Sequence, residues 1–248
     1  MQKYNIYIGS RYEHLREEIS EIARNGVPSA AEVIYSGRNT LYRMKFGNVT
    51  AVIKAFRLPG FINSRIYTTF RKSKAYRSYH NSKEMIRLGF HVPEPIAYIE
   101  VTRGMKLCES YYICEEVTGR ELRHWEEYPE SEPMLPELAK EIVKLHRAGV
   151  YHKDFSPGNI LYTGSPLTGY LFFFVDLNRM EFGVKSRRKL MSMFKSINLN
   201  VPEMVKLARL YAKAAGEDEE KVVAEAVAAN KKYMARREFK RKLKNRKK

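Results

Sequence analysis

The stretch of sequence that decides the fold is Tyr151-His152-Lys153-Asp154-Phe155-Ser156-Pro157-Gly158-Asn159-Ile160-Leu161. In it, Asp154 and Asn159 lie five residues apart, behind a histidine and ahead of an apolar segment. This pattern suits phosphoryl transfer, because an aspartate can orient an acceptor hydroxyl and take its proton while an asparagine carbonyl binds magnesium. His152 is predicted to be a structural histidine beneath this loop.

Two charged residues in apolar segments join Asp154 and Asn159 as candidates for the same chemistry. Asp176 ends the run Phe172-Phe173-Phe174-Val175, and Lys54 lies inside Val52-Ile53-Lys54-Ala55-Phe56. A charge in such surroundings is costly unless a partner compensates it, and a metal ion or a phosphate is such a partner. Taken alone, Lys54 also fits an edge-strand lysine that faces solvent, and Asp176 also fits a helix N-cap.

The composition describes a folded and strongly basic chain. Its 248 residues are 44% hydrophobic, which excludes an intrinsically disordered protein. No apolar run near the middle is long enough to span a bilayer, and the first residues show no apolar signal-peptide core, so we expect a cytoplasmic protein. The two cysteines, Cys108 and Cys114, exclude a disulfide framework and are predicted to be buried free thiols.

The positive charge is concentrated in two regions. The 45 basic and 28 acidic residues give a net charge of +17. Residues 231–248 hold eleven Lys or Arg against one acid, and residues 55–83 hold seven with no acid. Such regions indicate a polyanionic neighbour: nucleic acid, anionic lipid or a phosphorylated substrate. For the tail, a solvated segment that aids solubility is the alternative.

The order of predicted elements is that of an α+β protein with two lobes. Strands are expected at 31–35, 40–46, 49–56, 96–102 and 110–115, with a helix over 73–88 before the last two. A second helix follows, with Leu138, Ile142 and Leu145 on one face. A hairpin of 160–162 and 170–175 precedes a mostly helical remainder.

Together these features resemble the protein-kinase-like fold, over residues 32–179. The chain looks most like the lipopolysaccharide core kinases, the family that acts on Kdo or heptose sugars. That closer likeness lies in Ser36-Gly37-Arg38-Asn39, Arg71-Lys72-Ser73-Lys74-Ala75, Val92-Pro93-Glu94-Pro95, Ser156-Pro157-Gly158-Asn159-Ile160-Leu161 and Asp176-Leu177-Asn178-Arg179-Met180.

The resemblance implies a protein-kinase-like two-lobed fold, with a five-stranded N-lobe and a short, mostly helical C-lobe. Residues 1–30 would form an N-terminal helical extension and 31–117 the nucleotide-binding N-lobe. Residues 118–230 would form the C-lobe with the catalytic loop and the acceptor side, and 231–248 the basic tail.

The resemblance also implies ATP and Mg²⁺ as cofactors and assigns roles to four residues. Lys54 would hold the α- and β-phosphates of ATP, and Asp154 would be the catalytic base. Asn159 and Asp176 would bind the magnesium ion.

The adenine would meet a hinge segment, at the backbone carbonyl of Glu115 and the N–H of Val117. The chain departs from the kinase pattern elsewhere, since it has no Gly-x-Gly-x-x-Gly loop. Ser78 occupies the slot expected for the glutamate that pairs with the strand lysine, and Glu84 lies nearly two turns later. Two alternatives therefore remain for Lys54: it pairs with Glu84, or it has no carboxylate partner.

Three classes of function fit these residues. The first is an ATP-dependent kinase of a sugar hydroxyl on lipopolysaccharide core or a lipid A-linked precursor, peripheral at the inner face of the inner membrane. The second is another small-molecule kinase of the aminoglycoside type, whose acceptor pocket is usually acidic. The third is an atypical RNA-associated kinase or pseudokinase.

The C-terminus is predicted to be one helix from about residue 218. Val223, Val227 and Met234 are expected to pack inward. Phe239 and Leu243 would continue an apolar stripe among cations, which favours an anionic membrane surface as partner over nucleic acid.

Overall fold

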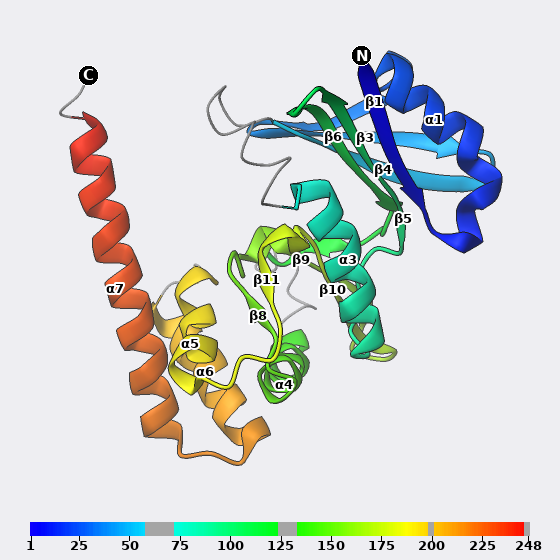
Figure 1. The fold of residues 1–248 in the computed structure, drawn as a ribbon. Coiled ribbons are helices and arrows are strands. Elements are labelled where there is room, and N and C mark those ends of the chain that lie inside the picture. Colours follow the sequence, from blue (N-terminus) through cyan, green and yellow to red (C-terminus); the bar gives the residue numbers. More distant parts are fainter. Residues whose placement is uncertain (58–71, 124–132, 198–200, 246–248) are drawn as a thin grey trace. The chain divides into compact units, whose positions relative to one another are not determined.

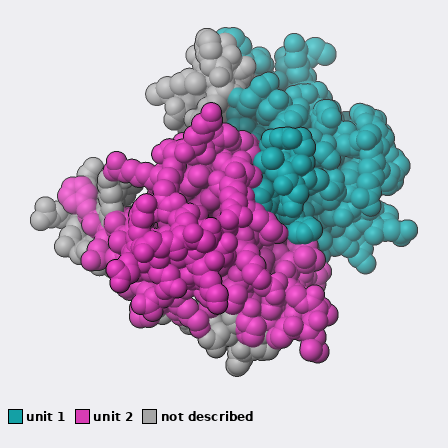
Figure 2. Space-filling view, turned by 90° about the horizontal axis from the view of Figure 1, so that it is seen from below, with its two compact units in different colours: residues 1–117 teal, residues 118–248 magenta. Residues whose placement is uncertain are grey.

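The computed structural model describes residues 1–57, 72–123, 133–197 and 201–245. By its internal contacts the chain divides into two compact units, Met1–Val117 and Thr118–Lys248 (Figure 2).

Unit 1 is built on a six-stranded antiparallel sheet in the order β1-β5-β6-β4-β3-β2 (Figure 1). Its strands are β1 (Gln2–Ile8), β2 (Glu32–Ser36), β3 (Asn39–Phe46), β4 (Val49–Phe56), β5 (Pro95–Arg103) and β6 (Lys106–Glu115). The five strands predicted from the sequence are all present.

The sheet of unit 1 carries helices on its two faces. The turn η1 (Ser10–Leu15) and helix α1 (Arg16–Asn25) pack with Ile99 and its neighbours on one face. Helix α3 (Lys74–Arg87) packs on the other, where Tyr98 lies. Adjacent residues of β5 enter different cores because successive side chains of a strand point to opposite faces. By the same alternation Lys54 shares the α3 face with Val52 and Phe56.

The sheet has one strand more than the five predicted for residues 31–117. Residues Gln2–Ile8, assigned to a helical extension, form β1 and pair with β5, with Ile6 opposite Ile99 and Ile8 opposite Ala97. The helix expected in this region exists as α1. The strand escaped notice because it is an edge strand with mostly exposed side chains, so its apolar alternation is weak.

Unit 2 contains short strands and four α-helices among its described residues. The hairpin β9 (Ile160–Ser165) and β10 (Gly169–Phe174) confirms the prediction, and β7 (Arg120–Glu121) extends it to three strands. A further pair joins β8 (Tyr151–His152) to β11 (Met180–Glu181). These two-residue strands are too short for a periodicity to reveal them.

The helices of unit 2 lie mostly after the hairpin. They are α4 (Met134–Arg147), α5 (Arg187–Met191), α6 (Val201–Ala215) and α7 (Glu219–Asn245), with the turns η4 (Pro157–Asn159), η5 (Leu177–Arg179) and η6 (Ser192–Ser196). No described helix is both long and apolar enough to cross a membrane.

Helix α7 packs along α6, η6 and α5 with its first half, and its C-terminal half extends past them (Figure 1). Val222 and Ala226 are fully buried, while Val223 and Val227 are half-buried. The expectation that Met234 packs inward is wrong, since its side chain is 47% exposed. Met234 lies in the C-terminal half of α7, which extends past these packing elements.

We predict that Ile8→Ala lowers the free energy of unfolding by about 2–5 kcal/mol, because Ile8 is 5% exposed and enters the α1 core. Tyr4→Ala in the same strand is the control, since Tyr4 is 44% exposed, and about 0.5 kcal/mol or less is expected there. Urea denaturation measures both. Equal values for the two variants would show that β1 does not belong to the core.

Candidate active site

The loop after β8 is closed by the backbone carbonyl of Asp154. It accepts the N–H of Ser156 at 2.8 Å and the side-chain Nδ2 of Asn159 at 2.8 Å. Because Nδ2 donates inward, the amide oxygen of Asn159 is the atom left to bind a ligand. The loop therefore presents an acceptor-only carboxylate at Asp154 and a carbonyl oxygen at Asn159.

His152 joins this loop to the end of β10. The histidine is 1% exposed, its Nδ1 accepts the backbone N–H of Asp154 at 3.2 Å, and its Nε2 lies 3.1 Å from the carbonyl of Val175. Since Nδ1 accepts, Nε2 carries the proton and donates to Val175. The prediction of a structural histidine is thus consistent with the geometry.

Asp176 is held next to Asn159 by the backbone. The N–H of Val175 donates to the carbonyl of Asn159 at 3.0 Å, one residue before Asp176. Asp176 is the single non-glycine residue of the described chain with positive φ, at 58°, and its carboxylate accepts a hydrogen bond from Asn178. Such a left-handed conformation costs of order 1 kcal/mol and gathers at functional sites.

Asn159 and Asp176 supply a donor set that fits magnesium. Mg²⁺ prefers oxygen ligands, is held by one or two protein side chains, and completes its shell with water and phosphate oxygens. The amide oxygen of Asn159 and the carboxylate of Asp176 meet that requirement. The backbone hydrogen bond from Val175 to Asn159 holds their two segments together.

The carboxylate of Asp154 is engaged by Arg179. Nη1 of Arg179 lies 3.1 Å from Oδ1 and 2.8 Å from Oδ2, and both side chains are about 40% exposed. The pairing of β8 with β11 sets Met180 opposite His152, which brings Arg179 to the loop. Arg179 was not predicted from the sequence as a functional residue, although it belongs to the motif Asp176-Leu177-Asn178-Arg179-Met180.

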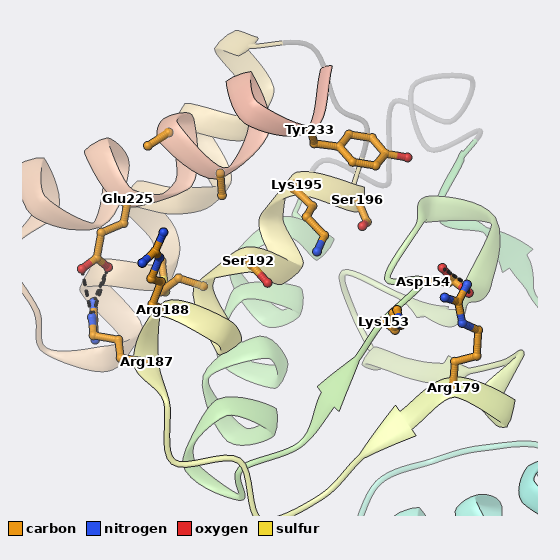
Figure 3. Close-up of a pocket in the computed structure, with 13 residues that line it drawn as sticks. Lys153, Asp154, Arg179, Arg187, Arg188, Ser192, Lys195, Ser196, Glu225 and Tyr233 are labelled. Atoms are coloured by element: carbon orange, nitrogen blue, oxygen red, sulfur yellow. Dashed lines mark hydrogen bonds and ion pairs between the residues drawn. The ribbon is translucent and has the colours of Figure 1, made fainter. Parts of the chain in front are cut away.

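A cavity of about 1020 Å³ opens beside this ion pair and lies wholly within unit 2 (Figure 3). Asp154 and Arg179 form one end of it in the view of Figure 3, and Arg187 with Glu225 forms the other. The full lining is Lys153, Asp154, Arg179, Arg187, Arg188, Met191, Ser192, Lys195, Ser196, Glu225, Ala228, Ala229 and Tyr233. Apart from Asp154, the predicted base, none of these residues was predicted from the sequence to line a site, because they come from four separate segments.

The other predicted site residues belong to unit 1. Lys54 is half-buried in β4, with its Nζ 5.4 Å from the centre of the Phe56 ring. Glu84 pairs with Arg87 in its own helix at 2.6 Å, and this hydrogen bond lowers the pKa of Glu84. Ser78, in the slot expected for a glutamate, is buried on α3.

The proposed hinge lies where β6 ends. The N–H of Glu115 donates to the carbonyl of Glu94 at 2.9 Å, and Tyr12 donates to Oε1 of Glu115 at 2.5 Å. Val117, half-buried, is the last residue of unit 1. The roles of Glu115 and Val117 toward adenine stay predictions.

The two cysteines differ in exposure. Cys114 is buried beside the hinge, as predicted, and burial raises the pKa of its thiol to about 12. Cys108 is partly exposed, so the prediction of burial is wrong for it. The end of β6 that carries Cys108 is covered less than the end that carries Cys114.

The basic stretch 55–83 lies partly outside the described residues, which exclude Arg65 and Arg71. Lys72 lies 4.4 Å from the centre of the Tyr76 ring, and Lys74 lies 5.6 Å from that of Phe56. These two cations therefore contact aromatic side chains of unit 1.

Comparison with known proteins identifies the family. The model of the lipopolysaccharide kinase (Kdo/WaaP) family matches residues 34–228, which is more than half of the chain. The chain belongs to this family. The matched span contains Lys54, Asp154, Asn159 and Asp176, so the resemblance seen in the sequence is confirmed.

Curated relatives are distant. A 3-deoxy-D-manno-octulosonic acid (Kdo) kinase of Vibrio vulnificus (strain CMCP6) is 23% identical over 146 residues, which cover 56% of this chain and 60% of that protein. A Kdo kinase of Vibrio parahaemolyticus serotype O3:K6 (strain RIMD 2210633) is 27% identical over 133 residues, which cover 51% and 56%. The chain thus matches less than two thirds of the length of these relatives.

Solved structures confirm the protein-kinase-like fold. WaaP in complex with acyl carrier protein is similar with a TM-score of 0.62 and 15% identity, covering 95% of this chain and 98% of that one. The Rio2 kinase of Chaetomium thermophilum, solved as an ADP/Mg²⁺-phosphoaspartate complex, has a TM-score of 0.51 and 16% identity, covering 92% and 77%.

We predict that His152→Leu lowers the free energy of unfolding by about 1–3 kcal/mol, because the part-buried Asp154 N–H and Val175 carbonyl lose their partner in the buried ring. His14→Leu, at an exposed histidine, is the matched control and is expected to change little. Thermal and urea denaturation compare the two. A loss no larger than that of the control would contradict the role of His152 as the link between the two loops.

Proposed function

We propose that the protein is an ATP-dependent kinase that phosphorylates a sugar hydroxyl of lipopolysaccharide core or of a lipid A-linked precursor, with Kdo preferred over heptose. The observation that carries this proposal is the Asp154–Arg179 ion pair at one end of a cation-lined cavity. This arrangement supports a role for Asp154 as the base, and the cavity beside it has room for a large acceptor. Membership of the Kdo/WaaP family supports the same reaction.

In this proposal Asp154 exchanges one contact with Arg179 for the acceptor hydroxyl and takes its proton. The hydroxyl oxygen forms a bond to the γ-phosphorus of ATP while the bond from that phosphorus to the ADP oxygen breaks. Arg179 keeps the carboxylate aimed at the hydroxyl. Asn159 and Asp176 would hold a magnesium ion, which when bound would neutralise charge on the phosphates.

The cavity argues against an aminoglycoside-type acceptor. Lys153, Arg188 and Lys195 line it together with the ion-paired arginines, so it would repel a cationic substrate. Kdo is a sugar acid, and the curated relatives are named as Kdo kinases. Kdo therefore suits the charge of the cavity better than an unphosphorylated heptose, which is neutral.

We predict that Asp154→Asn lowers acceptor phosphorylation by about two to four orders of magnitude while ATP still binds, because the base alone is lost. Asp176→Ala should also abolish magnesium-dependent ATP binding, because a metal ligand is removed. Transfer of labelled phosphate and nucleotide binding measure the two effects.

The control for both variants is Glu220→Gln, an exposed residue in the first turn of α7 that lines no part of the cavity. It should retain wild-type activity. If Asp176→Ala were as active as this control, the kinase assignment would fail.

We further propose that the C-terminal half of α7 holds the enzyme at the inner face of the inner membrane. Met234 and Phe239 are exposed there, the latter at 64%, on a helix segment rich in Lys and Arg. Exposed apolar groups among cations are typical of a helix lying on an anionic bilayer, and each cation near such a surface contributes about 1 kcal/mol. The side chain of Leu243 and residues 246–248 lie outside the described part of the tail.

We predict that a chain ending at Met234 no longer binds anionic liposomes, because nine cations and Phe239 are removed. This truncation keeps Tyr233, which lines the cavity, so turnover of a soluble sugar acceptor should stay within about twofold. Phosphorylation of a lipid-linked acceptor should slow. Liposome flotation and both activity assays test this.

A second variant, Phe239→Ser, removes the apolar side chain and keeps all the cations. If insertion of Phe239 into the bilayer contributes to binding, this variant should bind anionic liposomes more weakly. Undiminished flotation of the truncated chain would contradict the membrane proposal. Tight RNA binding that is lost on truncation would favour a nucleic-acid partner instead.

A further inference from the structure

Two of the five cations that line the cavity are neutralised by carboxylates. Arg179 pairs with Asp154, and Arg187 pairs with Glu217 at 2.5 Å and with Glu225 at 2.9 Å. These pairs have structural tasks, since the first orients the base and the second ties α5 to the start of α7. The hydrogen bond from Arg187 lowers the pKa of Glu217.

The other three, Lys153, Arg188 and Lys195, form no ion pair with a carboxylate among the residues that the structure describes. They nonetheless line one cavity, where their mutual repulsion is unfavourable. An anionic ligand would remove that cost. The cavity therefore carries a charge that its own described side chains do not balance.

Lys195 is the best positioned of the three. Its Nζ donates to the phenol oxygen of Tyr151 at 3.2 Å, and the same oxygen lies 3.4 Å from Ser192 Oγ. Tyr151 is buried in β8, directly before the catalytic loop. An ammonium has three donors, and Tyr151 takes one, so the others are available to a ligand in the cavity.

Figure 3 shows where this amine lies. Lys195 points into the cavity between Arg188 and the end formed by Asp154 and Arg179. An acceptor hydroxyl at Asp154 and an anionic group at Lys195 would thus occupy different places in one cavity.

The residues of helix α7 contribute to the size of the cavity. Helix α7 contributes Ala228 and Ala229, whose small side chains leave space, and the aromatic ring of Tyr233. At about 1020 Å³ the cavity is at the upper end of the range for small-molecule sites, so it has room for more than one sugar ring.

We infer that the cavity binds the acceptor through a carboxylate or phosphate separate from the reacting hydroxyl, with Lys195 and Arg188 as the residues that recognise it. The inference rests on the proposed function, to which it adds the residues that select an anionic acceptor. Tyr151 is the positioning residue for Lys195.

The binding of acceptor analogues, measured in the absence of nucleotide, tests the anion site independently of catalysis. In the carboxylate arm, ligand-observed NMR compares Kdo methyl glycoside with its methyl ester. In the phosphate arm, it compares glucose 1-phosphate with glucose. Wild-type protein should bind the charged form of at least one pair about tenfold more tightly, the effect expected of a charge-assisted hydrogen bond.

The variants Lys195→Met and Arg188→Gln should each lose about tenfold for that charged form and nothing for the neutral one. Lys189→Met is the matched control, because Lys189 also lies over the Tyr151 ring, at 5.3 Å, yet pairs with Glu181 and does not line the cavity. It should bind as wild type does. Arg188 is exposed on α5, so its replacement leaves the fold intact.

The outcomes separate the inference from the function on which it rests. Preference in the carboxylate arm alone assigns a sugar acid, and preference in the phosphate arm alone assigns a phosphorylated sugar. Equal binding of charged and neutral forms in both arms overturns the inference, even if the protein phosphorylates sugars. Anion-selective binding without any ATP-dependent transfer supports the anion site and overturns the kinase function instead.

Discussion

The buried imidazole of His152 is the contact on which the candidate site depends. It accepts the N–H of Asp154 through one nitrogen and donates to the carbonyl of Val175 through the other. One ring thereby spans two loops that lie more than twenty residues apart in the chain. Because the ring is buried, losing either bond would leave a backbone group without a partner, so the two loops are held as one unit.

The other parts of the site follow from that link. Once β10 ends beside the loop that carries Asp154, the Val175 N–H reaches Asn159 and Asp176 comes next to it in a left-handed conformation. The chain then returns as β11 along β8, and this pairing delivers Arg179 to the carboxylate of Asp154. The carboxylates of Asp154 and Asp176, the amide of Asn159 and the guanidinium of Arg179 are therefore brought together mainly by backbone hydrogen bonds.

The cavity depends on a second constraint, the attachment of α7. Arg187 pairs with Glu217, just before this helix, and with Glu225 within it, and these pairs tie α7 to α5. The same helix lines the cavity with its middle part and exposes Met234 and Phe239 farther on. In the functions proposed above, one rigid helix connects the acceptor site with the membrane surface, so adsorption and acceptor binding involve a single element.

The sequence by itself determined the elements whose patterns are local: the strands from β2 to β6, the β9–β10 hairpin, and the spacing of Asp154, Asn159 and Asp176. It did not predict β1, an edge strand whose side chains are mostly exposed and therefore show little apolar alternation. It also did not predict β7, β8 and β11, because strands of two residues are too short to show a periodic pattern. It also placed Met234 in a core. Only the tertiary structure decided which cations surround Asp154, because Arg179, Lys195 and the residues of α7 come from segments far apart in the chain. Their meeting depends on long-range pairing and packing, which residue spacing does not encode.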